Sequence, residues 1–151
     1  MRDLGLKPQV SHHDRRAYEE FTQALHATAE IISSAAWWHP AVRYEGVGRT
    51  ESFVQKFQAM YSALPDYIEA SAAAAGAIPQ LAAPKAGSLE GPALRDALAS
   101  LDAMTFYGPI SFGPTGKVEK LVPPVFQIQG GKPVVLAPSS IAQGELRLGI
   151  A

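Results

Sequence analysis

The sequence contains no cysteine. Disulfide bonds and thiolate chemistry are therefore excluded, while the compartment stays open because many proteins on either side of a membrane lack cysteine. An excess of charge of one sign is missing too, since 13 Lys and Arg stand against 14 Asp and Glu. The net charge of −1 gives no electrostatic reason to expect a nucleic acid as partner.

Long apolar runs are also absent. A membrane-spanning helix needs ~20 consecutive apolar residues, and no stretch of the chain approaches that length, so no direct insertion into a membrane is expected. The first residues have no hydrophobic core of a secretory signal, so no signal peptide is expected in this chain. The 151 residues, 47% hydrophobic and 18% charged, have the length and composition of one ordinary globular domain.

Several segments predict helices. Residues 15–27 repeat their apolar side chains three and four positions apart, which is typical of an amphipathic helix. A second helix is expected to begin with Thr50 as its cap and to carry an apolar stripe as far as Leu64. Residues 70–86 are alanine-rich and favour a third helix.

Prolines modify two of these expectations. Pro79 and Pro84 should interrupt the alanine-rich helix, because an interior proline removes a hydrogen bond and clashes with the preceding turn, at about 3 kcal/mol each. Gly91 and Pro92 instead predict the start of another helix, because proline is favoured in the first helical turn.

Strands are predicted at both ends of the chain. Residues 7–10 and 31–38 have the composition of short strands. Residues 126–129 alternate apolar and polar side chains, and the two glycines at 130–131 provide a hairpin turn into the apolar residues 134–136. The order of elements therefore predicts an α/β fold that ends in an antiparallel portion.

Candidate site residues are few. His12, His13 and Asp14 form the only cluster of possible ligands or bases, but neighbouring residues of a strand point to opposite faces, so the two histidines would share a metal only if the loop bends. No second cluster with zinc spacing follows, and a polar loop in which Asp14 caps a helix is the expected alternative to a metal site. Trp37 and Trp38 are expected either to stack on a ligand or to lie in the core.

No catalytic motif accompanies these residues. Residues 113–117 do not match a phosphate loop, because the spacing fails and Val118 stands where a serine or threonine would bind magnesium. Residues 46–48 hold only a fragment of a dinucleotide-binding motif, and no serine sits in the context of a nucleophile elbow. We therefore expect neither an enzyme nor a cofactor.

A series of short motifs runs through the chain in a fixed order. The segments are 3–8, 29–32, 38–40, 52–57 with Tyr61, 86–89, 93–98, 105–112 and 125–129. Their order and spacing resemble those of periplasmic substrate-binding proteins of the leucine/isoleucine/valine type, which serve ABC importers. The resemblance runs nearly from end to end, but members of that family are at least roughly twice this length and consist of two α/β lobes joined by crossover strands.

The resemblance implies a partial two-lobed fold of the type I periplasmic-binding-protein class, with parallel strands, flanking helices and an antiparallel C-terminal hairpin. Residues 1–40 would be the end of the second lobe, residues 41–120 the returning part of the first lobe, and residues 121–151 the crossover back. Most of the first lobe would then be absent, which makes the chain a C-terminal fragment.

The function implied by the resemblance is capture of a small polar ligand, an amino acid or an amide, for the membrane permease of an ABC importer in the periplasm. Ligands in such sheets lie beyond the carboxyl ends of the strands, which favours His12, His13 and Asp14 as contacts, with Trp37 as a stacking surface. Two alternatives stay open: a cytoplasmic ligand-sensing regulatory domain of the same fold, and a small enzyme that uses the histidines and the aspartate.

Overall fold

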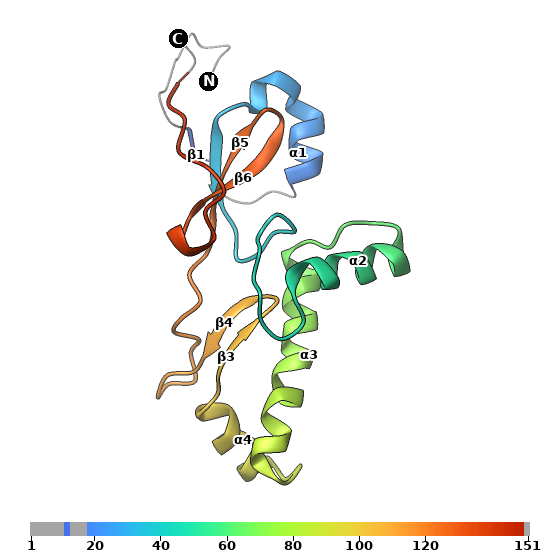
Figure 1. Cartoon of the computed structure of the whole chain (residues 1–151), viewed down its shortest axis with the longest axis vertical. Coiled ribbons are helices and arrows are strands. Elements are labelled where there is room, and N and C mark those ends of the chain that lie inside the picture. The colour runs from blue at the N-terminus through green and yellow to red at the C-terminus, as the bar shows by residue number, and fades with distance from the viewer. Residues whose placement is uncertain (1–10, 13–17, 150–151) are drawn as a thin grey trace. The chain divides into compact units, whose positions relative to one another are not determined.

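The computed structural model describes residues 11–12 and 18–149. The chain folds into two compact units. Unit 1 comprises Met1–Trp37 and Pro123–Ala151, and unit 2 comprises Trp38–Val122. Helices and strands follow one another in the order expected from the sequence, so the mixed α/β class is confirmed (Figure 1).

Unit 1 is built on one four-stranded sheet with the order β1-β2-β5-β6. The β1–β2 pair is parallel, and the other two pairs are antiparallel. The elements of this unit are β1 (Ser11–His12), α1 (Tyr18–Leu25), η2 (His26–Ala29), β2 (Ile32–Ala35), β5 (Val125–Gln129), β6 (Lys132–Ala137) and η3 (Ser139–Ile141). The helix predicted at 15–27 is confirmed over Tyr18–Leu25, and the strand predicted at 31–38 is confirmed over Ile32–Ala35. Residues 7–10 and 15–17 lie outside the described residues.

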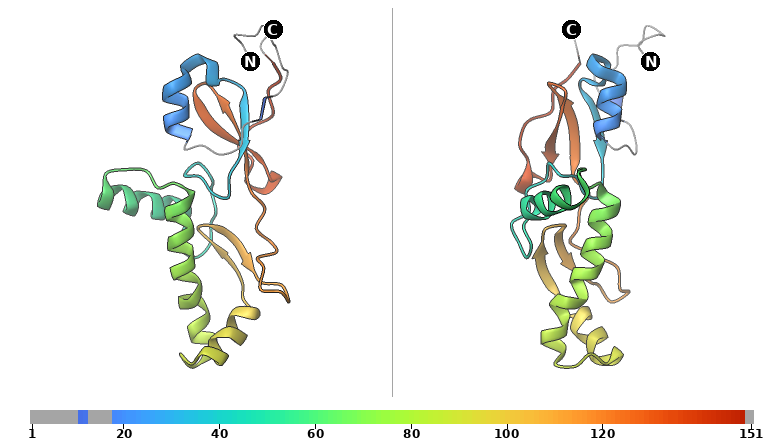
Figure 2. Two further views of the ribbon diagram at one scale, coloured as in Figure 1. Left: turned by 180° about the vertical axis from the view of Figure 1, so that it is seen from behind. Right: turned by 90° about the vertical axis from the view of Figure 1, so that its right-hand side faces the viewer.

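The predicted C-terminal hairpin is also confirmed. Gly130 and Gly131 have φ angles of 62° and 72°, the left-handed pair that a tight two-residue turn of this kind requires. The Glu30 carboxylate accepts hydrogen bonds from both turn amides, at 2.8 and 3.2 Å. Phe126 and Ile128 are buried on one face of the sheet. Figure 2 shows α1 on one side of the strands and the C-terminal segment on the other.

Unit 2 combines three helices with a two-stranded antiparallel sheet. Its elements are α2 (Thr50–Tyr61), α3 (Tyr67–Ala86), α4 (Gly91–Ala99), β3 (Asp102–Thr105) and β4 (Gly108–Ser111). As predicted, Gly91 and Pro92 form the first turn of α4. The chain from residue 41 to 49 forms a connector whose Val47 makes an isolated bridge to Thr105.

An aromatic cluster fills the centre of unit 2. Trp38 has no exposed surface and meets Phe53 edge to face, with ring centroids 5.7 Å apart. Phe106 stacks on Phe53 at 4.4 Å. The indole N–H of Trp38 donates to the Phe106 carbonyl at 3.1 Å, so the one polar atom of this buried side chain is satisfied.

The expected capping role of Thr50 is wrong. Arg49 occupies the N-cap position of α2, and Thr50 is the first helical residue. The buried Thr50 hydroxyl instead accepts from the Tyr44 amide at 3.1 Å and donates to the Phe106 carbonyl at 2.9 Å. These core hydrogen bonds compete successfully with capping, because a buried hydroxyl without partners costs more free energy than an exposed helix end.

Helix α2 also stops earlier than the apolar stripe suggests. It ends at Tyr61, and Ser62 adopts a left-handed conformation with a φ of 55°. Met60 and Leu64 are 73% and 47% exposed, so the C-terminal half of the stripe does not enter the core.

The prediction that prolines interrupt the third helix is wrong. Helix α3 runs for 20 residues through Pro79 and Pro84. Both of its ends are fixed: Asp66 forms a capping box with Glu69 at the start, and Gly87 closes the end in a left-handed conformation. These caps, together with alanines buried along one side, offset the two missing amide donors.

Replacing Gly76 with alanine is expected to stabilise unit 2. The position is exposed in the middle of α3, and an added Cβ meets no atom within 4 Å. Because glycine is a poorer helix former than alanine, the free energy of unfolding should rise by about 1 kcal/mol. Urea denaturation measures this difference. Gly87→Ala is the matched control, since its φ of 61° should reverse the sign of the effect.

Candidate functional site

Two of the predicted site residues, His12 and Trp37, belong to unit 1, where β1 and β2 end. These strands are parallel neighbours, so their carboxyl ends share one edge of the sheet. β1 ends at His12, and β2 ends at Ala35, two residues before Trp37. In open parallel α/β sheets, ligands bind beyond the carboxyl ends of the strands. In this four-stranded sheet, β1 and β2 are the parallel pair.

The four predicted contact residues are described to different extents. His13 and Asp14 lie outside the described residues, and His12 is described only as the last residue of β1, in register with Ser33. Trp37 is 53% exposed. The parallel pairing brings the strand end at His12 and the segment that carries Trp37 to one edge. The grouping of all four side chains around a ligand stays a prediction.

The two tryptophans have different environments. Trp38 is fully buried in the aromatic cluster of unit 2, which confirms the core alternative for this residue. Trp37 keeps about half of its surface exposed at the end of unit 1. An exposed indole offers a flat apolar face to a ligand, and its ring N–H can donate a hydrogen bond.

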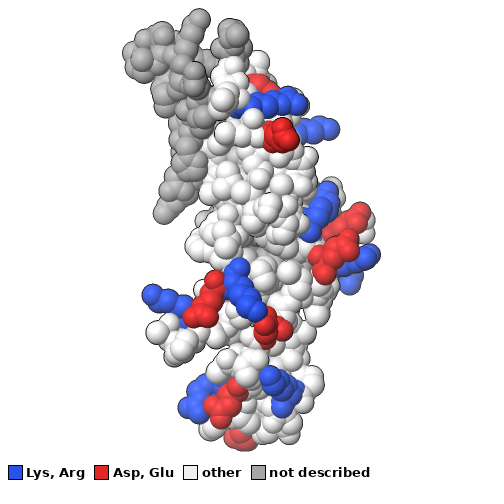
Figure 3. Space-filling model, turned by 60° about the vertical axis from the view of Figure 1, so that its left-hand side comes forward, with Lys and Arg blue, Asp and Glu red and all other residues white. Residues whose placement is uncertain are grey.

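Possible metal ligands do not gather within the described residues, and charges of both signs are mixed on one face of the molecule. Within residues 11–12 and 18–149, no group of three or more His, Asp or Glu side chains is placed to hold a metal ion. On the face shown in Figure 3, Lys and Arg lie interspersed with Asp and Glu. None of the helices in the described part of the chain has the length and apolar character of a membrane span.

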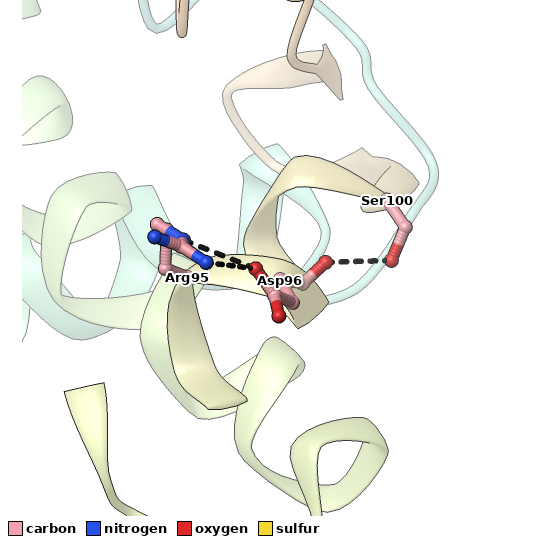
Figure 4. Close-up of polar contacts among 3 residues, drawn as sticks. All are labelled: Arg95, Asp96 and Ser100. Carbon is pink, nitrogen blue, oxygen red and sulfur yellow. Dashed lines mark hydrogen bonds and ion pairs between the residues drawn. The ribbon is translucent and has the colours of Figure 1, made fainter. Parts of the chain in front are cut away.

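A segment prominent in the sequence, residues 93–98, has a structural role in α4. Arg95 donates to Asp96 Oδ1 through Nε and Nη2, at 3.0 and 2.7 Å, and the Ser100 hydroxyl donates to the Asp96 carbonyl at 3.1 Å (Figure 4). Both partners of the ion pair are about 70% exposed, so it contributes at most ~1 kcal/mol.

Sequence reasoning missed a buried polar cluster on β5. Gln127 has no exposed surface, although the alternation of strand residues is often read as an outward polar face. Its amide bonds to the Ile31 carbonyl, to Ser33 Oγ and to both main-chain groups of Arg147. The only sequence signal is the repeat of glutamine at 127 and 129 within an otherwise apolar strand.

His39 is a partly buried histidine in unit 2 that the sequence presented as isolated. Its Nδ1 accepts a hydrogen bond from the Ala41 amide at 2.9 Å, which requires the neutral ring. Burial lowers the pKa of His39 from its ordinary value of 6.5 to about 4.

Acidification is therefore expected to destabilise unit 2. Between pH 6.5 and about 4, His39 takes up a proton in the unfolded chain but not in the folded chain. The free energy of unfolding has its highest value above pH 6.5 and should fall by up to ~3 kcal/mol as the pH drops to about 4. Urea titrations at several pH values measure this fall.

His39→Asn is the matched variant for the pH series, because an asparagine oxygen can replace Nδ1 as acceptor without titrating in this range. The difference between wild type and variant isolates the histidine from carboxylates that titrate near pH 4. Equal pH slopes for the two proteins would contradict the assignment.

Comparison with known proteins shows a relationship at the level of fold. No protein-family model matches the chain. A leucine-binding protein, LivK from Thermotoga maritima, superposes with a TM-score of 0.63 at 17% sequence identity. The match covers 90% of this chain and 38% of that protein. The chain therefore shares the fold of part of this leucine-binding protein and spans well under half of its length.

Proposed function

We propose that the chain is part of a solute-binding protein that captures a small polar ligand, such as an amino acid or an amide, for an ABC importer outside the cytoplasm. The observation that carries this proposal is the shared fold with a leucine-binding protein over 90% of the chain. In this proposal residues 1–40 and 121–151 belong to one lobe, and residues 41–120 belong to the other. The ABC permease is the partner of the complete protein.

The proposed contacts follow from the chemistry of such a ligand. The Asp14 carboxylate would pair with an ammonium or amide N–H group, and His12 and His13 would hydrogen-bond to its polar oxygens. Trp37 would cover the apolar part of the ligand with its exposed ring. Closure of two lobes over a ligand by hinge motion would exclude water and strengthen these contacts.

Because the chain spans 38% of its structural neighbour, the proposal includes a preceding segment that supplies most of the first lobe. Sequencing the DNA upstream of the Met1 codon tests this part. An upstream frame that encodes the rest of a first lobe and a secretory signal is expected. A clean promoter directly before Met1 would count against the proposal, and a complete frame without a secretory signal, beside regulatory genes, would favour a ligand sensor.

Ligand binding tests the site itself. The chain extended by its upstream frame is titrated with the twenty amino acids and with short amides by calorimetry. Asp14→Ala and Trp37→Ala are each expected to lower the affinity for the best ligand by about 10-fold or more, since each removes a contact worth at least ~1.4 kcal/mol. His26→Asn is the matched control, because His26 precedes the start of β2 at the opposite edge of the sheet.

A further inference from the structure

The C-terminal segment of unit 1 is attached to the sheet through its main chain. The Gln143 amide donates to the Val135 carbonyl at 2.8 Å. Further along, the Glu145 carbonyl accepts from Gln129 Nε2 at 2.8 Å. Both main-chain groups of Arg147 bond to the Gln127 side chain, the amide to Oε1 and the carbonyl to Nε2, each at 2.9 Å.

The Gln127 amide also contacts the sheet around it. The two hydrogens of its Nε2 are shared among the Arg147 carbonyl and the longer contacts to the Ile31 carbonyl at 3.2 Å and Ser33 Oγ at 3.3 Å, and its Oε1 also accepts from Gln129 Nε2 at 2.8 Å. Ser33 is the cross-strand partner of Gln127 in the β2–β5 register. One acceptor and one donor are thus presented together, as a strand residue presents them to a residue of the neighbouring strand.

The side chains of residues 142–148 contribute little to this attachment. Residues 142–148 are all exposed, with Leu146 at 52% and Leu148 at 61%. Gly144 has a steric requirement, since a Cβ there would lie 2.8 Å from Val134 Cγ1. A segment with so little buried surface belongs to the least stable part of a fold and opens readily.

We propose that the side chains of Gln127 and Gln129 form a binding site for an extended polypeptide main chain, which residues 143–147 occupy within the same molecule. The ligand class is an extended segment with a free N–H and C=O at the position of Arg147 and a C=O two residues earlier. Its side chains are unrestricted except for a glycine at the position of Gly144. When residues 143–147 leave, a peptide from another molecule can take their place.

The test weakens the attachment of the resident segment without altering the receptor. In Arg147→Pro the segment loses the N–H that Gln127 Oε1 accepts, while the full chain and both glutamines are kept. Binding of a fluorescent peptide that copies residues 143–149 is measured by polarisation. Because an attached segment competes at an effective concentration of ~1 mM, the variant should bind the peptide at least about 10-fold more tightly than wild type.

Two controls make the result specific. Arg147→Ala keeps the N–H and should bind the peptide as weakly as wild type, and a peptide with proline in place of the residue that copies Arg147 should not bind Arg147→Pro. A peptide with alanine at the copies of Leu146 and Leu148 should bind as well as the original. Equal binding of the proline and original peptides, or no gain in Arg147→Pro, would overturn the proposal.

Hydrogen exchange on the wild-type chain tests the resident contact without any substitution. The Arg147 amide is expected to exchange about 10-fold or more below its intrinsic rate. Exchange at the intrinsic rate would show that Gln127 does not hold this segment, and the proposal would fail even if Arg147→Pro could not be prepared in folded form.

Discussion

Replacing Gly46 with alanine is expected to lower the free energy of unfolding of unit 2 by about 3 kcal/mol or more. A Cβ at this position would lie 2.2 Å from the Met104 carbonyl oxygen and 2.3 Å from its carbon. Both are main-chain atoms of β3, so no side-chain rotation relieves the overlap. Overpacking alone costs ~1–3 kcal/mol. Moving the connector away from β3 would also weaken the hydrogen bonds between these two segments.

Those hydrogen bonds fix the connector against β3. The Val47 amide donates to the Met104 carbonyl at 2.9 Å, and the Phe106 amide donates to the Val47 carbonyl at 3.1 Å. Displacement of residue 46 would weaken both and disturb Phe106, which belongs to the aromatic cluster.

Urea denaturation followed by tryptophan fluorescence measures the effect. Gly76→Ala is the matched control, because the same substitution in the same unit should raise the free energy of unfolding. A loss below ~1 kcal/mol in Gly46→Ala would mean that the close approach of Gly46 and Met104 does not exist in solution.

The structure also explains the glycines at 46 and 48 that prompted comparison with a nucleotide-binding motif. Gly46 is required by the approach to β3, and Gly48 has a φ of 75°, which favours glycine. Both positions lie between β2 and α2, but the long connector 36–49 separates these elements, whereas a dinucleotide motif needs a tight turn from strand to helix. Packing of the connector is therefore sufficient to account for both residues.

Features set by local interactions were predictable from the sequence. The Gly130–Gly131 turn is one example, because its conformation depends on two residues without side chains. The start of α4 at Gly91 and Pro92 is another. In each case the residues that specify the structure are adjacent in the chain, so tertiary contacts had little to override.

Features set by tertiary contacts were not predictable. Thr50 has the residue type of a cap, but its hydroxyl bonds to Phe106, 56 residues away. Pro79 and Pro84 lie within a helix whose two caps and buried alanines keep it intact. Gln127 is buried because Ile31, Ser33 and the C-terminal segment satisfy its amide. Single-sequence patterns carry no information about such distant partners.

For the candidate site, the sequence identified residue types but not their environments. Two adjacent tryptophans offered either a ligand surface or core packing, and the sequence provided no way to separate them. The structure assigns Trp38 to the core, where it meets Phe53 and bonds to the Phe106 carbonyl, and leaves Trp37 53% exposed. This contrast gives the second large expected effect.

Trp38→Ala is expected to lower the free energy of unfolding of unit 2 by ~3–5 kcal/mol, the range for removal of a buried large aromatic side chain. The substitution would leave a cavity against Phe53 and remove the hydrogen bond to the Phe106 carbonyl. Trp37→Ala, its adjacent control, should lower stability much less, by about 1 kcal/mol, since the side chain is 53% exposed.

Circular dichroism during urea denaturation compares the two variants without relying on the tryptophan that is removed. Losses of similar size would show that Trp37 also packs in a core and is unavailable to a ligand. If Trp38→Ala loses much more stability than Trp37→Ala, the Trp37 variant is a folded protein, and weaker ligand binding by its extended form reports a lost contact. The stability measurement therefore has to precede the binding measurement, because only a folded Trp37 variant separates recognition from folding.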